Sequence, residues 1–340
     1  MNKARIGFIG CGRHATNDLY PNLCRIPNME LVATCDLKED LAKKNARLFG
    51  AGHYYTDLSK MVENEQLDAV LIVGPPQMHE EVGIECLNRG LHIFVEKPSA
   101  ITVEGSRKLA EAADRAGKYG QIGHMMRHSP PLQLAKRIAS SEGFGRPIYL
   151  ESKYFTSGPR EPRTFWGLQD LEWTYLLVQG LHPVDLAHFY MGEIKNVDAK
   201  LANGRDGRLA FTVGIEFTNS GVGSLNFSSS FPGWETRLEV VGDGGAFVQV
   251  DNMSRLRYSE DIPWSKDLDF REPILSKTWD IAPYDQGERI GYRGELLHFI
   301  DCVASNFEPT PNLWDGYRSM VVCRAILESA REGKVVSIRY

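Results

Sequence analysis

The chain has 340 residues, of which 42% are hydrophobic and 24% charged, and its formal net charge is -5. This length suggests two domains, because single hydrophobic cores stop growing at about 250–300 residues. A modest negative charge with no block of lysine or arginine argues against a nucleic-acid-binding protein. We find no long apolar span and no signal peptide, so we expect no membrane association.

The six cysteines are scattered along the chain and form no Cys-x-x-Cys pair. This spacing is typical of reduced thiols and differs from that of a disulfide framework or a zinc site. We therefore expect a cytoplasmic protein without a metal site.

The first predicted strand, residues 4–9, ends in a glycine-rich turn. A helix over about residues 15–25 and a second strand over 31–35 complete the setting of a dinucleotide-binding turn. Gly10 permits the tight turn, Gly12 lets a pyrophosphate approach the backbone, and Ala15 allows close helix–strand packing. The diphosphate would lie on the N–H groups at the start of that helix. We expect the cofactor to contact Gly10, Cys11, Gly12, Arg13 and His14.

Asp36 follows the second strand, 21 residues beyond Ala15. A carboxylate at this distance can hold the ribose hydroxyls of the adenosine half of the cofactor and repels a 2′-phosphate. The sequence therefore predicts NAD as cofactor. Lys38 and Arg13 are close enough in sequence to leave NADP open.

Strands and helices continue to alternate as far as residue 125. Helices are predicted over residues 38–49, 57–63, 79–89 and 102–116, and strands over 69–73, 92–96 and 121–123. This alternation indicates a Rossmann-type, doubly wound parallel sheet over residues 1–125, with helices on both faces. Ligands of such sheets bind outside the carboxyl ends of the strands.

Two of these strand ends carry polar or turn-forming residues. Gly74 and Pro75 follow one strand, with His79 nearby, and Glu96-Lys97-Pro98 ends the next. Pro98 stops the strand and restricts Lys97 to an extended backbone, and a cis bond between them would direct the amine into the cleft. We expect Gly74, Pro75, His79, Glu96 and Lys97 at the cofactor. The alternative for Lys97 is an ordinary surface lysine.

The pattern changes to period two from about residue 146, as in residues 211–217, where apolar and polar side chains alternate. Helices are predicted again over 293–305 and 315–332, and a last strand over 335–339. We expect an α+β domain over residues 126–340, with one sheet face packed on helices and the other left for solvent or another subunit.

A predicted helix over residues 174–191 places Val178, His182 and Asp185 on one face. A lone helical histidine is more often structural than catalytic, and the preference for a catalytic role here rests on the paired Asp185 together with the family resemblance given below. Tyr175 and Gln179 could supply further hydrogen bonds to a substrate.

Residues 153–173 are expected over the cleft and contain tryptophan and arginine. Indole rings stack on sugars, and guanidinium groups suit phosphate or carboxylate, which leaves a phosphorylated or acidic sugar open as substrate. The alternative is a solvated loop with a structural tryptophan. Arg127 either lines the cleft or pairs with a carboxylate at a domain interface. The candidates for substrate binding are Asp185, Arg127, Arg163, Trp166, Tyr175 and Gln179.

Over essentially its whole length, the chain resembles the glucose-fructose oxidoreductase / inositol dehydrogenase / rhizopine catabolism family (Gfo/Idh/MocA). The motifs that carry the resemblance are Gly7-Phe8-Ile9-Gly10-Cys11-Gly12, Gly74-Pro75-Pro76 with His79, Glu96-Lys97-Pro98, residues 123–127, residues 180–185, and Arg293-Gly294-Glu295 before Phe299. The resemblance implies an NAD(P)-dependent oxidoreductase of sugar or cyclitol hydroxyls, with Lys97 and His182 in the active site. It also implies a large, mostly antiparallel open sheet in the second domain, often used to form homo-dimers or homo-tetramers.

The chain departs from the family at Val178, where members commonly carry an aspartate four residues before the histidine. We interpret Lys97 and His182 as an acid–base pair that serves hydride transfer at a secondary hydroxyl of a small sugar-like substrate, with Asp185 fixing the substrate or the imidazole. Two alternatives remain: a non-catalytic NAD-binding regulator, and a reductase of a keto-sugar or an unsaturated compound.

Overall fold

The computed structural model describes residues 3–157, 165–260, 276–281 and 285–340. The chain forms two compact units. The first unit comprises residues 1–128 and 291–320, and the second comprises residues 129–290 and 321–340. The units are therefore not consecutive in sequence, because a segment near the C-terminus is part of the first.

The first unit contains a six-stranded parallel sheet in the order β3-β2-β1-β4-β5-β6. This topology confirms the predicted doubly wound sheet. The chain builds outward from β1 in one direction and then from β4 in the other, so the strand order reverses between these two strands, where such sheets bind their ligands. The strands are β1 (Ala4–Ile9), β2 (Met29–Cys35), β3 (His53–Tyr55), β4 (Ala69–Ile72), β5 (His92–Glu96) and β6 (Gly120–Gly123).

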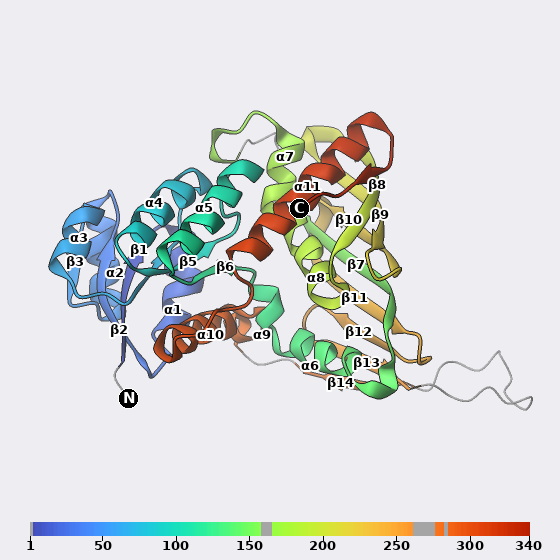
Figure 1. The fold of residues 1–340 in the computed structure, drawn as a ribbon, viewed down its shortest axis with the longest axis horizontal. Coiled ribbons are helices and arrows are strands. Elements are labelled where there is room, and N and C mark those ends of the chain that lie inside the picture. The colour runs from blue at the N-terminus through green and yellow to red at the C-terminus, as the bar shows by residue number, and fades with distance from the viewer. Residues whose placement is uncertain (1–2, 158–164, 261–275, 282–284) are drawn as a thin grey trace, which may run out of the picture. The chain divides into compact units, whose positions relative to one another are not determined.

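Helices cover both faces of this sheet (Figure 1). Successive side chains of a strand point to opposite faces, so in β5 the ring of Phe94 packs in one core, whereas Ile93 and Val95 pack in the other. The core around Phe94 includes α1 (Tyr20–Leu23), α2 (Glu39–Phe49) and α10 (Tyr292–Ser305). The opposite core includes α3 (Leu58–Asn64), α4 (Pro76–Asn88) and α5 (Val103–Ala116).

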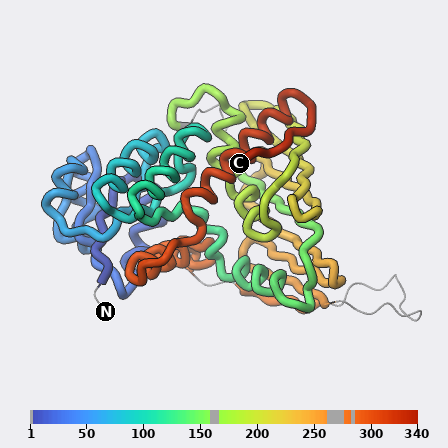
Figure 2. The backbone as a smooth tube through the Cα atoms, in the orientation of Figure 1, coloured from blue at the N-terminus to red at the C-terminus, as the bar shows by residue number. Residues whose placement is uncertain are grey.

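The helix α10 comes from the C-terminal part of the chain but packs against the first residues of the fold. It contacts α1 and β1, and Figure 2 shows its orange-red path beside the blue beginning of the chain. The ring of Phe299 in α10 lies 5.9 Å from that of Phe94 in β5. This contact brings α10 to the strand that ends at Lys97.

Local signals set several helix boundaries in this unit. The side chain of Thr102 accepts a hydrogen bond from the Gly105 N–H at the start of α5, and Asp57 does the same for the Lys60 N–H at the start of α3. The helix α2 ends at Gly50, which adopts the left-handed conformation with φ 79°.

The second unit contains a nine-stranded sheet in the order β14-β13-β12-β11-β7-β10-β9-β8-β15. All neighbouring pairs are antiparallel except β7 and β10, which confirms the mostly antiparallel sheet that the resemblance implied. The strands are β7 (Pro147–Ser157), β8 (Ile194–Asn203), β9 (Leu209–Phe217), β10 (Val222–Ser228), β11 (Ser230–Gly242), β12 (Phe247–Asp251), β13 (Arg255–Ser259), β14 (Lys277–Asp280) and β15 (Val336–Ser337).

Along β9 one face of this sheet is buried and the other exposed, as the period-two pattern predicted. In β9, Phe211, Val213 and Ile215 are buried, whereas Thr212 and the other intervening residues are exposed. The helices of the second unit are α6 (Pro130–Ala139), α7 (Leu171–Tyr175), α8 (Leu181–Met191) and α9 (Gln286–Ile290), and α8 packs on β7. The long helix α11 (Leu313–Glu332) contributes residues to both units.

All six cysteines are free. In the described part of the chain, no helix combines the length and the apolar character that crossing a bilayer requires.

Candidate active site

The glycine-rich turn after β1 is shaped to receive a ligand. Gly10 has φ 100°, and a Cβ atom there would lie 1.9 Å from the carbonyl oxygen of Val73, so only glycine fits. At Gly12, by contrast, an added Cβ would meet none of the described atoms within 4 Å. The backbone of the turn is therefore open on this side, as the approach of a cofactor pyrophosphate requires.

The carboxylate of Asp36 is fixed beside this turn. Its Oδ2 accepts a hydrogen bond of 2.8 Å from the Cys11 N–H, and its Oδ1 accepts one of 2.9 Å from the Lys38 N–H. The end of β2 and the turn after β1 are thus linked through one side chain. This arrangement suits the binding of ribose hydroxyls, and the residues at this edge of the sheet fit NAD.

His79 connects the ends of β4 and β5. Its Nδ1 donates a hydrogen bond of 2.8 Å to the carbonyl oxygen of Pro98, and its Nε2 accepts one of 3.1 Å from the Gly74 N–H. Burial lowers the pKa of His79, so the ring is neutral with its proton on Nδ1. Both ring nitrogens of His79 therefore form hydrogen bonds within the protein. Pro75, which follows Gly74, is the N-cap residue of α4.

Lys97 stands at the end of β5, and its bond to Pro98 is cis, which confirms the prediction. Burial lowers the pKa of Lys97, although the charges of Glu96 and Glu295 partly oppose this effect. The amine therefore loses its proton more readily than that of an ordinary lysine. A lysine with this property is better suited to act as a base than an ordinary lysine.

Glu96 is 3% exposed and uses both carboxylate oxygens. Oε2 accepts a hydrogen bond of 2.8 Å from the Lys97 backbone N–H, and Oε1 lies 3.4 Å from Nε2 of His14. Burial raises the pKa of Glu96, but the hydrogen bond from His14 and the charges of His14, Lys97 and His79 lower it overall. Glu96 is therefore a buried carboxylate whose two oxygens contact the backbone of Lys97 and the partly exposed ring of His14.

Glu295 in α10 is a functional candidate that the sequence analysis quoted in the motif Arg293-Gly294-Glu295 but did not assign to the site. It is fully buried, and neither carboxyl oxygen has a hydrogen-bond partner among the described residues. Burial raises its pKa well above the usual range, and the charge of Glu96 raises it further, against a smaller opposing effect of Lys97. The available signal was its position on the apolar stripe of the helix, next to Leu296 and one turn before Phe299.

The packing explains why Glu295 comes close to the end of β5. Phe94 and Glu96 are two residues apart in β5 and share a face of the sheet, whereas Glu295 and Phe299 are four apart in α10 and share a face of the helix. The two phenylalanine rings are in contact, and the Gln121 amide donates a hydrogen bond of 2.9 Å to the carbonyl oxygen of Glu295. Gln121 lies beside Phe94 in the register of β6 and β5.

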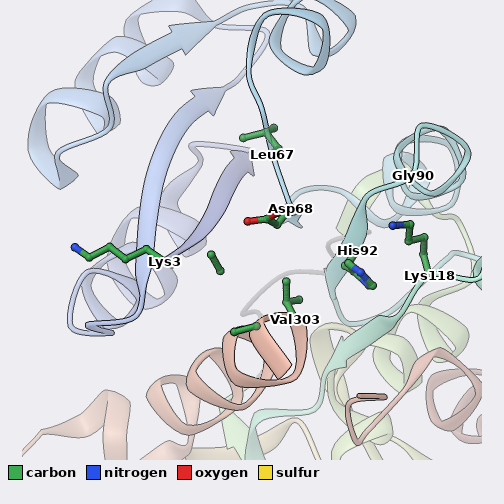
Figure 3. A pocket seen from close by; sticks show the side chains of 9 residues that line it. Lys3, Leu67, Asp68, Gly90, His92, Lys118 and Val303 are labelled. Carbon is green, nitrogen blue, oxygen red and sulfur yellow. The ribbon is translucent and has the colours of Figure 1, made fainter. Parts of the chain in front are cut away.

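A cavity of about 320 Å³ lies at the opposite edge of the same sheet (Figure 3). Its lining includes Lys3, Asp68, His92 and Lys118, which stand at or just before the amino ends of strands, and Val303 of α10. Because ligands of doubly wound sheets bind at the carboxyl ends, this cavity is separate from the predicted cofactor site.

His182 lies in the second unit, at the start of α8. It is buried, and its ring stacks on that of Tyr154 at 5.1 Å between centroids. Asp185 follows on the same helix and is 1% exposed. The helix is interrupted before this point by a π-helical turn over Leu176–Gly180, which contains Val178 and Gln179, both partly exposed.

The other predicted substrate residues are in varied surroundings. Tyr175 is buried and stacks on Phe211, and burial raises its pKa. Arg127 is buried in the first unit, with its guanidinium 3.5 Å from the carboxylate of Asp315. Trp166 adopts a left-handed backbone conformation with φ 57°. Arg163 lies outside the described residues, and Arg13 is exposed on the glycine turn.

Two family models match the chain. Residues 4–124 match the Gfo/Idh/MocA oxidoreductase family, NAD-binding Rossmann fold, and residues 137–338 match the C-terminal alpha/beta domain of the same family. The matched segments contain the glycine turn and Lys97 in the first case and His182 in the second.

Similar proteins include two curated relatives. The chain is 28% identical to scyllo-inositol 2-dehydrogenase (NAD(+)) of Bacillus subtilis (strain 168), over 99% of this chain and 97% of the relative. It is also 28% identical to inositol 2-dehydrogenase of Rubrobacter xylanophilus, over 96% of this chain and 91% of the relative.

Solved structures share the fold. A dehydrogenase from Chromobacterium violaceum superposes with a TM-score of 0.89 at 25% identity, covering 98% of this chain and 96% of that one. Levoglucosan dehydrogenase in complex with NADH and L-sorbose superposes with a TM-score of 0.83 at 20% identity, covering all of both chains (100% each).

Proposed function

Because this chain belongs to the Gfo/Idh/MocA family of oxidoreductases, with an NAD-binding Rossmann domain, we propose that it oxidises a secondary hydroxyl of a cyclitol or sugar with NAD. The predictions of the family and of NAD as cofactor are confirmed by the family match. The observation that carries the proposal is the position of Lys97, which directly follows β5 in the same sheet as the glycine turn and has a pKa lowered by burial.

Oxidation of an alcohol requires the loss of a proton from the hydroxyl as well as of a hydride from its carbon. NAD, when bound, supplies the hydride acceptor. In our proposal the neutral amine of Lys97 takes the hydroxyl proton, and without this step the product would be a high-energy protonated ketone. His182 serves the same substrate as the second acid–base group, and Asp185 orients the substrate or the imidazole.

The names of the relatives favour a cyclitol as substrate. Both curated relatives reported above are inositol dehydrogenases, and they are similar to this chain over nearly their whole lengths. The departure at Val178 removes a carboxylate that family members commonly have near the histidine. Gln179 and Tyr175 are therefore proposed to contribute to substrate binding, as are Arg127, Arg163 and Trp166.

The test is the absorbance of reduced nicotinamide in mixtures of the purified protein, NAD and one compound from a panel of inositols, sugars and sugar phosphates. We expect turnover with at least one inositol, and a weaker response when NADP replaces NAD. Ketones with NADH form a second panel, which detects a reductase. Binding of NAD without turnover on either panel would contradict the proposal and would support a regulatory protein.

We also propose that the exposed face of the nine-stranded sheet joins copies of the chain into a homo-dimer or homo-tetramer. Charged residues alternate along this face, with Arg237 and Glu239 on β11 and Glu151 on the neighbouring β7. Light scattering on the purified protein tests this proposal, because a monomer would contradict it. The free cysteines support a further proposal, that the protein works in the reducing cytoplasm.

A further inference from the structure

We propose a route by which the proton taken up at Lys97 reaches solvent. The proton passes from Lys97 to Glu96, then to His14, and finally to Asp18 or water. This inference rests on the proposed dehydrogenase function, because an alcohol oxidation releases one proton per turnover. Glu96, His14 and Asp18 all lie in the first unit. The motifs quoted above do not assign a role in proton transfer to any of the three.

The three side chains form a hydrogen-bonded series. Nε2 of His14 lies 3.4 Å from Oε1 of Glu96, and Nδ1 of His14 lies 2.9 Å from Oδ2 of Asp18. Glu96 is 3% exposed, whereas the side chains of His14 and Asp18 are each 44% exposed. The series therefore leads from a buried carboxylate beside Lys97 to a carboxylate in contact with water.

Neighbouring elements hold the imidazole in this position. His14 precedes the π-helical turn Ala15–Leu19, and the spacing of four residues brings Asp18 to the same side. The ring of Tyr292, the first residue of α10, stands edge-on to the imidazole at 5.7 Å. The imidazole is thus oriented between two carboxylates by contacts from three parts of the chain.

The charges around His14 suit a group that gains and loses a proton. Burial lowers its pKa, but the hydrogen bonds and charge of Glu96 and Asp18 raise it overall, against an opposing effect of Lys97. The charges of Lys97 and His79 in turn lower the pKa of Glu96, and the charge of Glu96 raises the pKa of Glu295. Burial and the charge of Glu96 raise the pKa of Glu295, whereas Oε1 of Glu96 contacts the ring of His14, which makes His14 the outlet in our proposal.

The proton transfers balance without any change of electrons. The neutral amine of Lys97 takes the hydroxyl proton and becomes an ammonium group. It gives a proton to the carboxylate of Glu96. The protonated Glu96 passes it to Nε2 of His14 when the imidazole is neutral and carries its single proton on Nδ1. The imidazole releases its other proton from Nδ1 to Asp18 or to water, and rotation or exchange restores the starting tautomer.

The test compares His14→Ala with the wild type and with His53→Ala, using the substrate found in the panel. His53 is the matched control, because it is an exposed histidine that also contacts a carboxylate, with Nδ1 2.6 Å from Oε1 of Glu65. We expect His14→Ala to lower kcat at least tenfold, to change KM for the alcohol less than threefold, and to recover when imidazole is added. The control should retain the wild-type values.

Several outcomes separate the route from the function. An unchanged kcat in His14→Ala, with Lys97→Met inactive, would overturn the route and leave the dehydrogenase in place. A rise in KM for NAD alone, without imidazole rescue, would show that His14 only contacts the cofactor. Absence of turnover in the wild type would defeat the proposed function itself.

A second measurement tests the series without turnover. The ring protons of His14 in the full chain are titrated by NMR in the wild type and in Glu96→Gln. We expect the pKa of His14 to lie above its usual value and to fall in the variant. Equal titration curves would overturn the proposal, since the charge of Glu96 would then have no effect on the pKa of His14.

Discussion

The carboxyl groups of Glu96 and Glu295 share one buried environment, and the charge of Glu96 helps to keep the proton on Glu295. A negative charge on either carboxylate stabilises an ammonium group on Lys97 and so raises its pKa. The effect of burial outweighs the charges of both Glu96 and Glu295, so the pKa of Lys97 is lowered. Glu295, which comes from α10, thus influences the pKa of Lys97 at the end of β5.

Replacement of Glu295 by Gln should change how stability depends on pH. The pKa of Glu295 is raised in the folded state, so above pH 4.5 the folded chain holds a proton that the unfolded chain has lost. The free energy of unfolding therefore falls as pH rises above 4.5. Glu295→Gln lacks this loss, and we expect it to be more stable than the wild type at pH 8 and similar to it at pH 4.

Urea unfolding at several pH values measures this difference. The matched control is Glu81→Gln, which removes an exposed carboxylate from α4 and should follow the wild-type curve. Parallel curves for Glu295→Gln and the wild type would show that Glu295 is ionised in the folded protein.

Replacement of Lys97 by Met should lower kcat by roughly 10²- to 10⁴-fold, the usual contribution of a positioned acid–base group. Methionine keeps an unbranched side chain of similar length, so NAD binding should change little. Lys118→Met is the control, because Lys118 is a half-buried lysine that lines the cavity at the opposite edge of the sheet. Equal rates for Lys97→Met and the wild type would remove Lys97 from the mechanism.

The pH profile of the wild type should show the lowered pKa of Lys97 directly. A base acts in its neutral form, so kcat/KM should rise with pH and level off below pH 10.5, the value for an ordinary lysine. Steady-state rates across this range provide the measurement. A rise that continues to pH 10.5 would indicate an unperturbed amine.

Replacement of Asp36 by Ala should weaken the binding of NAD about ten- to hundredfold, since charge-assisted hydrogen bonds contribute about 1.5–3 kcal/mol each. It also removes the negative charge that repels a 2′-phosphate, so discrimination against NADP should decrease. Fluorescence titration with NADH and NADPH gives both affinities. Asp40→Ala, an exposed carboxylate in the first turn of α2, is the control.

The first unit should become less stable in acid, because two of its buried histidines resist protonation in the folded state. Burial, with smaller effects of neighbouring cations, lowers the pKa of His124 and of His128 from 6.5 to about 3 in each case. Between pH 6.5 and 3 the unfolded chain binds these protons and the folded chain does not. Stability should therefore fall by on the order of 1 kcal/mol per pH unit for each histidine.

Unfolding followed by circular dichroism between pH 7 and 4 measures this loss. In His128→Asn the dependence on pH should be weaker than in the wild type, whatever the stability of the variant at pH 7. An unchanged slope would mean that His128 is already protonated in the folded state.

The local motifs were sufficient to predict the parallel sheet, the glycine turn and the positions of Asp36 and Lys97. Each depends on residues near one another in sequence: Gly10 fits a turn that a Cβ would obstruct, and Pro98 ends the strand that bears the lysine. The alternation in β9 likewise determined which side chains of the second sheet are buried.

Only the tertiary structure decided the partners of these residues. His14 and Glu96 are 82 residues apart, and Glu295 reaches the same region because α10 returns to pack on the first sheet. A sequence pattern specifies which face of a helix is buried but not which charged group lies opposite that face. The environment that sets the proton affinities of Lys97, His14 and Glu295 is therefore a property of the packing, since burial and long-range contacts determine it.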